Sequence, residues 1–530
     1  MPTRKNRTRV LVAGSITTAL ALSAAGYGIA GAAQDPPALA FKAVTPNVTA
    51  TKYISEDYSY FDLDLGVNLI AGKQAFEIQA KRKNYAQPIV AQQMVTGRNG
   101  KKQGVPLPDG IFSTFAGFQD FTTITIKDAA GETVKEYTTD WCPNTYNSTR
   151  TRPDAPATTP YPMDCSGWNP FTLGSVWGVQ AGYNSPIEFF PRGNDPWEQP
   201  DFDLPVGDFQ VGIKLNDKYK NWLKVPDADA TVSLNLKVQE IREDANEQGA
   251  ARAKALMRAA AAGDELPKGA VGVRGEHGEH AGQGDETVQI SQIDPTFRPP
   301  AKAPKAMAKA PKAGPRPDLR SLPAWGIDLS EEDGKTYVNF GATVWNAGTS
   351  PLMVDGFRRT GTELMDAYQY FYDADGNEVG SVNAGTMEWD AREGHMHWHF
   401  TDFAQYNLLA SDRKRVEKSG KEAFCLANTD AVDYTIPNAK WRPGNNDLST
   451  SCGGNTAVAV REVLDVGNGD TYSQSRPGQS FDITDVPNGT YFIETLANPE
   501  KKLAELKTDN NSALRKIILG GTPGARTLEV

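Results

Sequence analysis

The sequence predicts an all-β protein built from two antiparallel β-sandwich domains joined by a linker rich in Ala, Lys and Pro. Hydrophobic and polar residues alternate in many short runs, and clusters of Pro, Gly, Asn and Asp separate these runs. A tract at 299–317 divides the runs into two groups, because its composition cannot build a core. The clearest runs are 60–67, 121–126, 209–215, 231–238, 336–345, 368–372, 480–483 and 491–496.

Four segments follow from this division. We expect a signal peptide at 1–33, a β-rich accessory domain of unknown role at 41–240, a flexible linker at 241–317 and the second sandwich at 318–520. The linker includes an alanine-rich stretch, 244–262, that could form one helix. The accessory domain contains no histidine and no evident catalytic set of residues.

Composition limits the class of function. The chain has 530 residues, enough for two or three domains, and its apolar fraction of 39% suits a globular protein. A net charge of -10 argues against a general nucleic-acid binder, whereas an acidic surface could attract cationic amines.

The amino terminus has the pattern of an export signal. A basic start that includes Arg4 and Lys5 precedes an apolar stretch at 10–25, and Ala30-Gly31-Ala32 offers a cleavage site. The alternative is an uncleaved membrane anchor, although the apolar stretch is short for a spanning helix. We therefore expect a secreted protein, extracellular or associated with the cell wall, with no membrane span in the mature chain.

Four cysteines agree with export. They allow three pairings, of which local pairing, Cys142–Cys165 and Cys425–Cys452, is the simplest. An oxidising compartment would preserve such disulfides. A competing interpretation makes Cys425 and Cys452 copper ligands.

Three of the five histidines occupy alternate positions, His395, His397 and His399. In a β-strand they would share one face, while Met396, Trp398 and Phe400 would point into a core. Three imidazoles suggest copper or zinc. The outer two histidines of a flat strand lie about 13 Å apart, so one ion can bind all three only if the strand twists sharply or breaks near one end.

The segment from about 322 to 518 resembles the lysyl oxidase catalytic domain. The resemblance rests on the histidine triplet, on Lys421-Glu422-Ala423-Phe424-Cys425-Leu426 and on Asp470-Thr471-Tyr472, in that order. Further matching stretches are 338–340, 346–350, 402–403, 406–409, 482–486, 498–499 and 508–511, together with Trp389. The segment departs from vertebrate members in having few cysteines, and Asn468 stands where those members have one.

The resemblance implies a site and a reaction. The three histidines would bind copper, and Lys421 and Tyr472 would cross-link into lysine tyrosylquinone, with Lys418 as a rival partner. A general base is also required, and the candidates are Asp402, Asp482, Asp485 and Asp509.

The leading hypothesis is a copper-dependent amine oxidase that acts on peptidyl lysine or small alkyl amines and releases aldehyde, ammonia and hydrogen peroxide. One alternative is a secreted, non-catalytic copper-binding wall or matrix protein. Another is a zinc hydrolase that uses the same histidine triplet.

Overall fold

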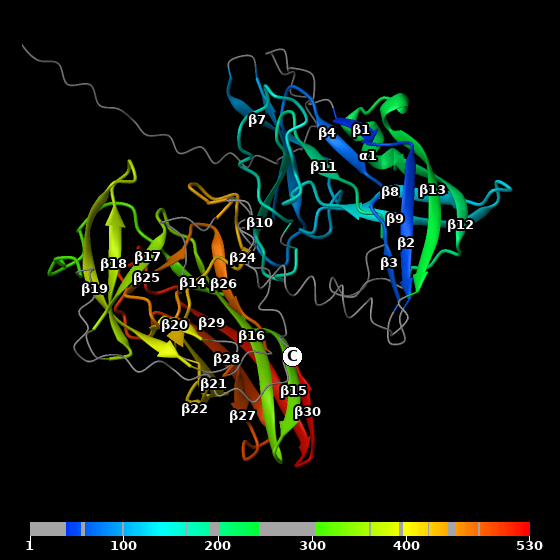
Figure 1. Cartoon of the computed structure of the whole chain (residues 1–530). Coiled ribbons are helices and arrows are strands. Elements are labelled where there is room, and N and C mark those ends of the chain that lie inside the picture. Colours follow the sequence, from blue (N-terminus) through cyan, green and yellow to red (C-terminus); the bar gives the residue numbers. More distant parts are fainter. Residues whose placement is uncertain are drawn as a thin grey trace, which may run out of the picture.

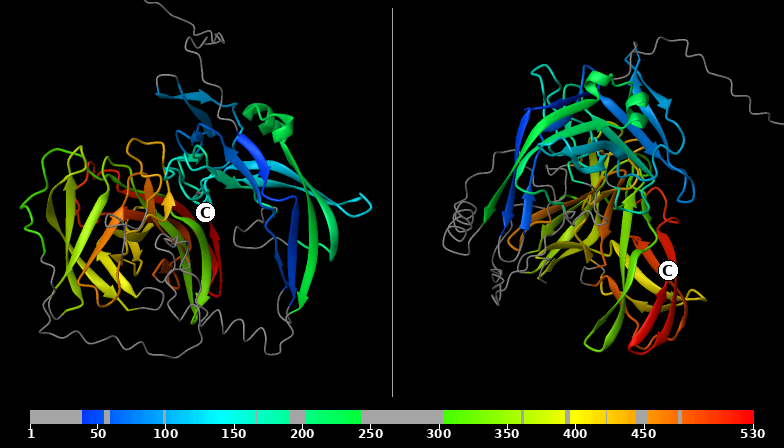
Figure 2. Two further views of the ribbon diagram at one scale, coloured as in Figure 1. Left: turned by 45° about the horizontal axis from the view of Figure 1, so that its top comes forward. Right: turned by 90° about the vertical axis from the view of Figure 1, so that its right-hand side faces the viewer.

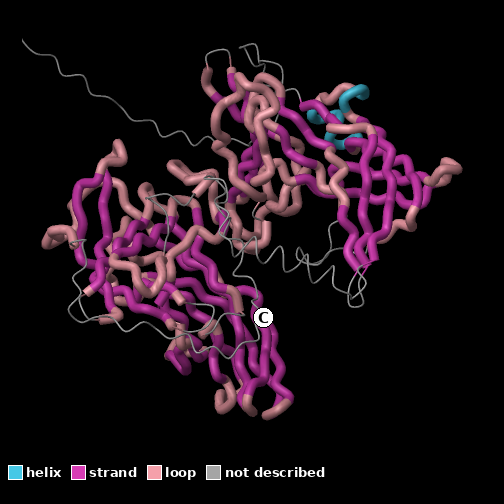
Figure 3. The backbone as a smooth tube through the Cα atoms, viewed as in Figure 1, coloured by secondary structure: helices cyan, strands magenta, loops and turns pink. Residues whose placement is uncertain are grey.

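A computed structural model describes residues 39–54, 59–97, 100–165, 167–190, 202–242, 303–359, 362–391, 396–421, 423–443, 452–474 and 478–530. These residues form β-strands almost throughout, which confirms the prediction of an all-β fold (Figure 3). The predicted signal peptide and the predicted helix at 244–262 lie outside the described residues. Within the described part of the chain, no helix is both long and apolar enough to cross a bilayer.

Residues 39–242 form an amino-terminal unit of three sheets (Figure 1). In spatial order, the first sheet contains β1 (Leu39–Ala43), β4 (Val67–Ala71) and β11 (Asn184–Pro186). The second contains β10 (Gly174–Val179), β5 (Phe76–Lys81), β6 (Val90–Thr96) and β7 (Lys102–Pro106). The third contains β3 (Ser59–Asp62), β2 (Asn47–Ile54), β13 (Thr231–Arg242), β12 (Gly207–Leu215), β8 (Phe118–Lys127) and β9 (Thr133–Trp141). The pairing of β2 with β13 is parallel, which departs from the antiparallel prediction.

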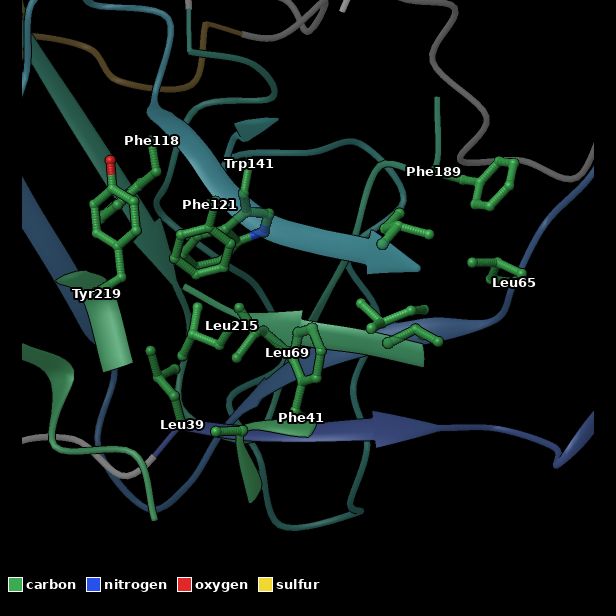
Figure 4. Packing of buried hydrophobic residues seen from close by; sticks show 14 of the residues in the cluster. Leu39, Phe41, Leu65, Leu69, Phe118, Phe121, Trp141, Phe189, Leu215 and Tyr219 are labelled. Carbon is green, nitrogen blue, oxygen red and sulfur yellow. The ribbon is translucent and has the colours of Figure 1, made fainter. Parts of the chain in front are cut away.

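Alternation produces the core of this unit. In β12, Phe209, Val211, Ile213 and Leu215 are buried on one face, whereas Gln210 faces solvent. Aromatic rings complete the same core, and Figure 4 shows Phe118, Phe121, Trp141 and Tyr219 packed together. The helix α1 (Asp217–Leu223) and the 3₁₀ turn η1 (Asp227–Asp229) follow β12. The disulfide Cys142–Cys165 closes the long loop after β9.

One predicted strand is divided. The run at 60–67 forms the end of β3 and the start of β4, because Gly66 adopts a φ of 61° between them. Glycine accepts this left-handed conformation at little cost, so the chain turns there while Leu63 and Leu65 stay buried.

Residues 319–529 form a second group of three sheets. The first contains β14 (Leu319–Ser321), β16 (Lys335–Asn346), β26 (Asn468–Tyr472) and β24 (Asp430–Ala431), with β15 (Trp325–Glu332) and β27 (Ser480–Asp482) also paired to β16. The second contains β23 (Ala423–Phe424), β20 (His397–Thr401), β19 (Glu378–Asp390), β18 (Leu364–Tyr372), β17 (Leu352–Arg358) and β25 (Ala459–Leu464). The third contains β22 (Arg415–Lys418), β21 (Ala404–Ala410), β28 (Gly489–Ala497), β29 (Ser512–Thr522) and β30 (Ala525–Glu529).

A separate apolar core lies between these sheets. It includes Phe340, Trp398, Phe400, Tyr406 and Ile493, all of them almost inaccessible to solvent. Residues 303–317, predicted as part of the linker, run along this unit without regular secondary structure, and the Met307 amide donates to the Ser381 carbonyl.

The two units touch where β10 approaches β24, as two views of the ribbon show (Figures 1 and 2). The Leu173 amide donates to the Val432 carbonyl at 2.7 Å, and the Tyr434 amide donates to the Gly174 carbonyl at 2.9 Å. The amino-terminal unit therefore adds a short stretch of backbone to the edge of the sheet that carries Tyr472.

Candidate active site

The histidine strand begins at His397, one residue after a break in the extended backbone. Met396 has a φ of 27°, so the strand does not continue through it. Trp398 and Phe400 point into the core as predicted, but Met396 is 49% exposed, and its predicted burial is wrong. A break near one end is the condition under which three alternate histidines can approach one ion. His395 itself lies outside the described residues.

His397 and His399 lie on one face of β20, with their ring centroids 4.7 Å apart. The neighbouring strand β19 places Asp390 opposite His397 and diagonal to His399. The Asp390 Oδ2 atom lies 3.2 Å from His399 Nδ1. A carboxylate on one imidazole nitrogen fixes the tautomer and the orientation of the ring, so that the other nitrogen can bind a metal ion, as in many metal sites.

These residues fit a copper ion in the nature of their donors. Two imidazoles on one strand face, one of them oriented by a buried carboxylate, are suited to a borderline metal ion. Among the described residues no cluster of three metal-ligating side chains occurs, and the third histidine of the triplet is not one of those residues.

Lys421 and Tyr472 meet inside the second unit. The Lys421 side chain is 1% exposed, and its Nζ atom lies over the Tyr472 ring, 4.6 Å from the centroid. The Phe424 ring packs edge-on against the same tyrosine at 5.0 Å. A buried amine held against a phenol ring is the arrangement that a lysine–tyrosine cross-link requires, so the pair fits lysine tyrosylquinone.

The Tyr472 hydroxyl is held by backbone. It donates to the Cys425 carbonyl and accepts from the Cys425 amide, both at 3.1 Å. Burial is the main cause that raises the pKa of Tyr472 well above its usual value, and Asp470 and Glu462 raise it further. Tyr472 is therefore a neutral phenol at physiological pH in the protein without metal.

Strand pairing and a disulfide connect the histidine strand to the segment that holds the Tyr472 hydroxyl. Phe400 on β20 pairs with Phe424 on β23, immediately before the cysteine that holds the tyrosine hydroxyl. The disulfide Cys425–Cys452 reinforces this connection, because the Trp398 amide donates to the Cys452 carbonyl at 2.9 Å. Both cysteines are in the disulfide, so they are not copper ligands in this structure.

Lys418, the rival partner, lies elsewhere. It ends β22, an edge strand of the third sheet of this unit, and pairs in register with Asn407. Lys418 is only partly buried, whereas Lys421 is almost fully enclosed beside the tyrosine. The geometry favours Lys421.

Two buried carboxyl groups lie close to the pair. Asp470 is 3% exposed and stands two residues before Tyr472 on β26, so both side chains share a strand face. Burial raises the pKa of Asp470 well above its ordinary value, Asp430 adds to this, and the nearby Lys421 charge acts in the opposite direction. Burial likewise raises the pKa of Glu462, whose Oε2 atom accepts from the Leu426 amide at 2.9 Å.

The four predicted base candidates have other surroundings. Asp402 pairs with Lys502 at 2.6 Å, and Asp482 pairs with Lys335 at 2.9 Å. Hydrogen bonds from Thr484 and then from Lys335 lower the pKa of Asp482 to about 2. The candidates Asp485 and Asp509 are exposed. In the described part of the chain, no hydrogen bond or ion pair joins any of the four to Lys421 or Tyr472.

Asp470 is the carboxylate that sequence reasoning missed. It belongs to the Asp-Thr-Tyr stretch that carries the resemblance, and its spacing of two residues from Tyr472 on a strand places it on the tyrosine's face. That spacing was a usable signal.

The geometry is that of a β-sandwich unit in which a histidine strand adjoins a buried lysine packed on a partly buried tyrosine. Residues 371–525 match the family model described as lysyl oxidase, which confirms the resemblance of this segment to that family. "Lysyl oxidase homolog 3" of Homo sapiens is 29% identical over 130 residues, and "Lysyl oxidase homolog 4" of Mus musculus is 30% identical over 131 residues. Each of these matches covers 24% of this chain and 15% of the relative.

Proposed function

We propose that the protein is a copper-dependent amine oxidase that converts primary amines, either peptidyl lysine or small alkyl amines, into aldehydes. The observation that carries the proposal is the buried Lys421 amine over the Tyr472 ring, next to the histidine strand. The overall change balances as amine, dioxygen and water giving aldehyde, ammonia and hydrogen peroxide.

The copper ligands would be His395, His397 and His399, with Asp390 orienting His399. Lys421 and Tyr472 would supply lysine tyrosylquinone. This cofactor would supply an electrophilic carbonyl for the substrate amine and a two-electron acceptor that dioxygen can reoxidise.

The chain's own residues would handle the protons and exclude water. The proton on the carbon next to the amine nitrogen must be taken by a base, and Asp470 is placed for this by sharing a strand face with Tyr472. Its raised pKa means that burial makes the carboxylate a stronger base than an exposed aspartate. Phe424 and the buried Lys421 side chain cover part of the tyrosine ring and would limit access by bulk water.

The two disulfides agree with function outside the cytoplasm, where they form and persist. The net charge of -10 suits encounter with cationic amines such as lysine side chains.

The proposal is tested with the copper-loaded protein and an alkyl amine. We expect peroxide release that phenylhydrazine, a carbonyl reagent, abolishes, and a tryptic peptide in which Lys421 is covalently joined to Tyr472. A non-catalytic copper protein gives neither result, and a zinc hydrolase gives no peroxide. Copper-loaded protein without the joined peptide would contradict the proposed function.

We expect His397→Ala to lose copper and therefore never to form the cross-link. Asp390→Asn should act in the same direction but less severely, weakening copper binding by about 10–100-fold, because the histidine loses its orienting carboxylate. Metal analysis after dialysis against a graded chelator measures both effects. An active His397→Ala protein with full copper content would refute the assignment of this ligand.

A further inference from the structure

We propose that Asn169, in the amino-terminal unit, is a positioning residue for the site, holding the Tyr472 strand in place through Asp430 and Thr471. This inference rests on the proposed function for its catalytic consequence. It assigns the amino-terminal unit a role, because that unit then completes the support of the tyrosine.

Backbone hydrogen bonds join the two units beside the strand that carries Tyr472. The segment around Leu173 and Gly174 bonds to Val432 and Tyr434, so it continues the sheet beyond β24. On its other side β24 pairs with β26, with Asp430 opposite Gly469. The amino-terminal unit is therefore separated from the strand of Tyr472 by a single short strand.

A chain of side-chain hydrogen bonds also connects the amino-terminal unit to the strand of Tyr472. The Asn169 Nδ2 atom donates to Asp430 Oδ2 at 2.6 Å. The Thr471 hydroxyl donates to Asp430 Oδ1 at 2.7 Å, and the Thr429 hydroxyl donates to the same oxygen at 2.6 Å. The Thr429 hydroxyl also accepts from the Thr471 amide at 2.8 Å, so both the backbone and the side chain of Thr471 are held.

The cluster of Asn169, Asp430, Thr429 and Thr471 is largely buried, and its hydrogen bonds fix the orientation of Asn169. Asn169 is 2% exposed and Asp430 is 5% exposed, so water cannot substitute for a missing partner. The Asn169 amide is oriented before it reaches Asp430, because its Oδ1 atom accepts from the Phe171 amide at 2.9 Å. Asn169 Nδ2 also lies 3.3 Å from the Thr343 hydroxyl, which bonds to the Thr471 hydroxyl at 2.6 Å.

The link to Tyr472 follows from strand geometry. Thr471 faces Asp430, so its neighbours Asp470 and Tyr472 face the opposite side of the strand, where Lys421 lies. A shift or loosening of Thr471 must therefore move the tyrosine ring relative to the lysine amine. Cross-linking and turnover both depend on that placement to within fractions of an ångström.

An exchange of partners tests this. The single variant Asn169→Asp places a second carboxyl group against Asp430. The double variant, Asn169→Asp with Asp430→Asn, restores one carboxylate and one amide. In the double variant the amide at position 430 donates and the carboxylate at position 169 accepts. The amide oxygen at position 430 can still accept from Thr429 and Thr471. Asn169→Ala is a milder single change. Tyr161→Phe is the matched control, because it removes a 3.0 Å hydrogen bond to Glu77 where Tyr161 stacks on Trp441 across the units, without touching Asp430.

Hydrogen exchange of the peptide spanning 468–472 is read together with the yield of the Lys421–Tyr472 peptide. We expect exchange in Asn169→Ala to accelerate by about tenfold or more, because a buried carboxyl oxygen loses its hydrogen-bond donor. Asn169→Asp should exceed this effect, and the double variant should return towards the native rate and yield. Tyr161→Phe should leave both measurements unchanged.

Native exchange in Asn169→Ala, or a double variant no better than Asn169→Asp, would overturn the positioning role. If the native protein itself contains no cross-linked peptide, the proposed function fails, and the exchange rates still decide whether Asn169 holds the strand.

Discussion

Tyr472→Phe is expected to abolish amine oxidation while copper stays bound. Phenylalanine keeps the ring against Lys421 and Phe424 but lacks the oxygen that any quinone needs. The loss should be at least about 10³-fold, the scale seen when an essential catalytic group is removed. Amine-dependent peroxide release, copper content and the mass of the 421–472 peptide pair measure the three parts of this result.

The control for this variant is Tyr406→Phe. Tyr406 is a buried aromatic neighbour whose ring packs on Phe424, and it has no contact with the Cys425 backbone among the described hydrogen bonds. Tyr406→Phe should retain turnover. Turnover by Tyr472→Phe at more than a few per cent of the native rate would exclude a tyrosine-derived cofactor at this position.

Asp470→Asn is expected to give the second largest effect, a fall in turnover of about 10²–10⁴-fold, the usual contribution of a general base. The amide fills the same space but cannot accept a proton. Because the pKa of Asp470 is raised, native turnover should increase with pH as this carboxyl ionises, and the variant should lack that acidic limb. Initial rates measured across the pH range provide the comparison.

The same substitution should change stability in a defined direction. A carboxyl whose folded pKa lies above its unfolded pKa contributes stability that is present below the unfolded pKa and is lost as pH rises through the folded pKa. The neutral amide avoids that loss, so Asp470→Asn should unfold at a higher temperature than the native protein at neutral pH. An unchanged pH profile with native turnover would exclude Asp470 as the base.

Much of the fold follows from local patterns. Alternation in β12 and β20 predicts which side chains are buried, and the turn at Asp373–Asn377 predicts the hairpin of β18 and β19. Alternation fails at Met396, because its positive φ interrupts the extended backbone before His397 and the residue itself is not a glycine. The division at Gly66 could have been anticipated from the glycine.

The histidine triplet is predicted from its residue type and spacing, because the chain has only five histidines, whereas the Lys421–Tyr472 pair is predicted only through the family resemblance. The candidate bases were sought among aspartates in matching loops, whereas burial and a shared strand face distinguish Asp470. The burial of Asp470 is not visible without the packing of β26, whereas the shared face could have been inferred from the two-residue spacing. The contact between Asn169 and Asp430 spans 261 positions of sequence and lies outside any periodic run, so no local pattern could reveal it.

The hydrogen bonds of the Leu173–Gly174 backbone to the segment after β24 also affect the tendency of the protein to aggregate. A carboxy-terminal half produced alone would present the Val432 carbonyl and the Tyr434 amide as an open sheet edge, beside the apolar surface of Val432 and Tyr434. Open edges of this kind pair with other chains and promote aggregation. The amino-terminal unit thus covers an edge that would otherwise favour self-association of the carboxy-terminal unit.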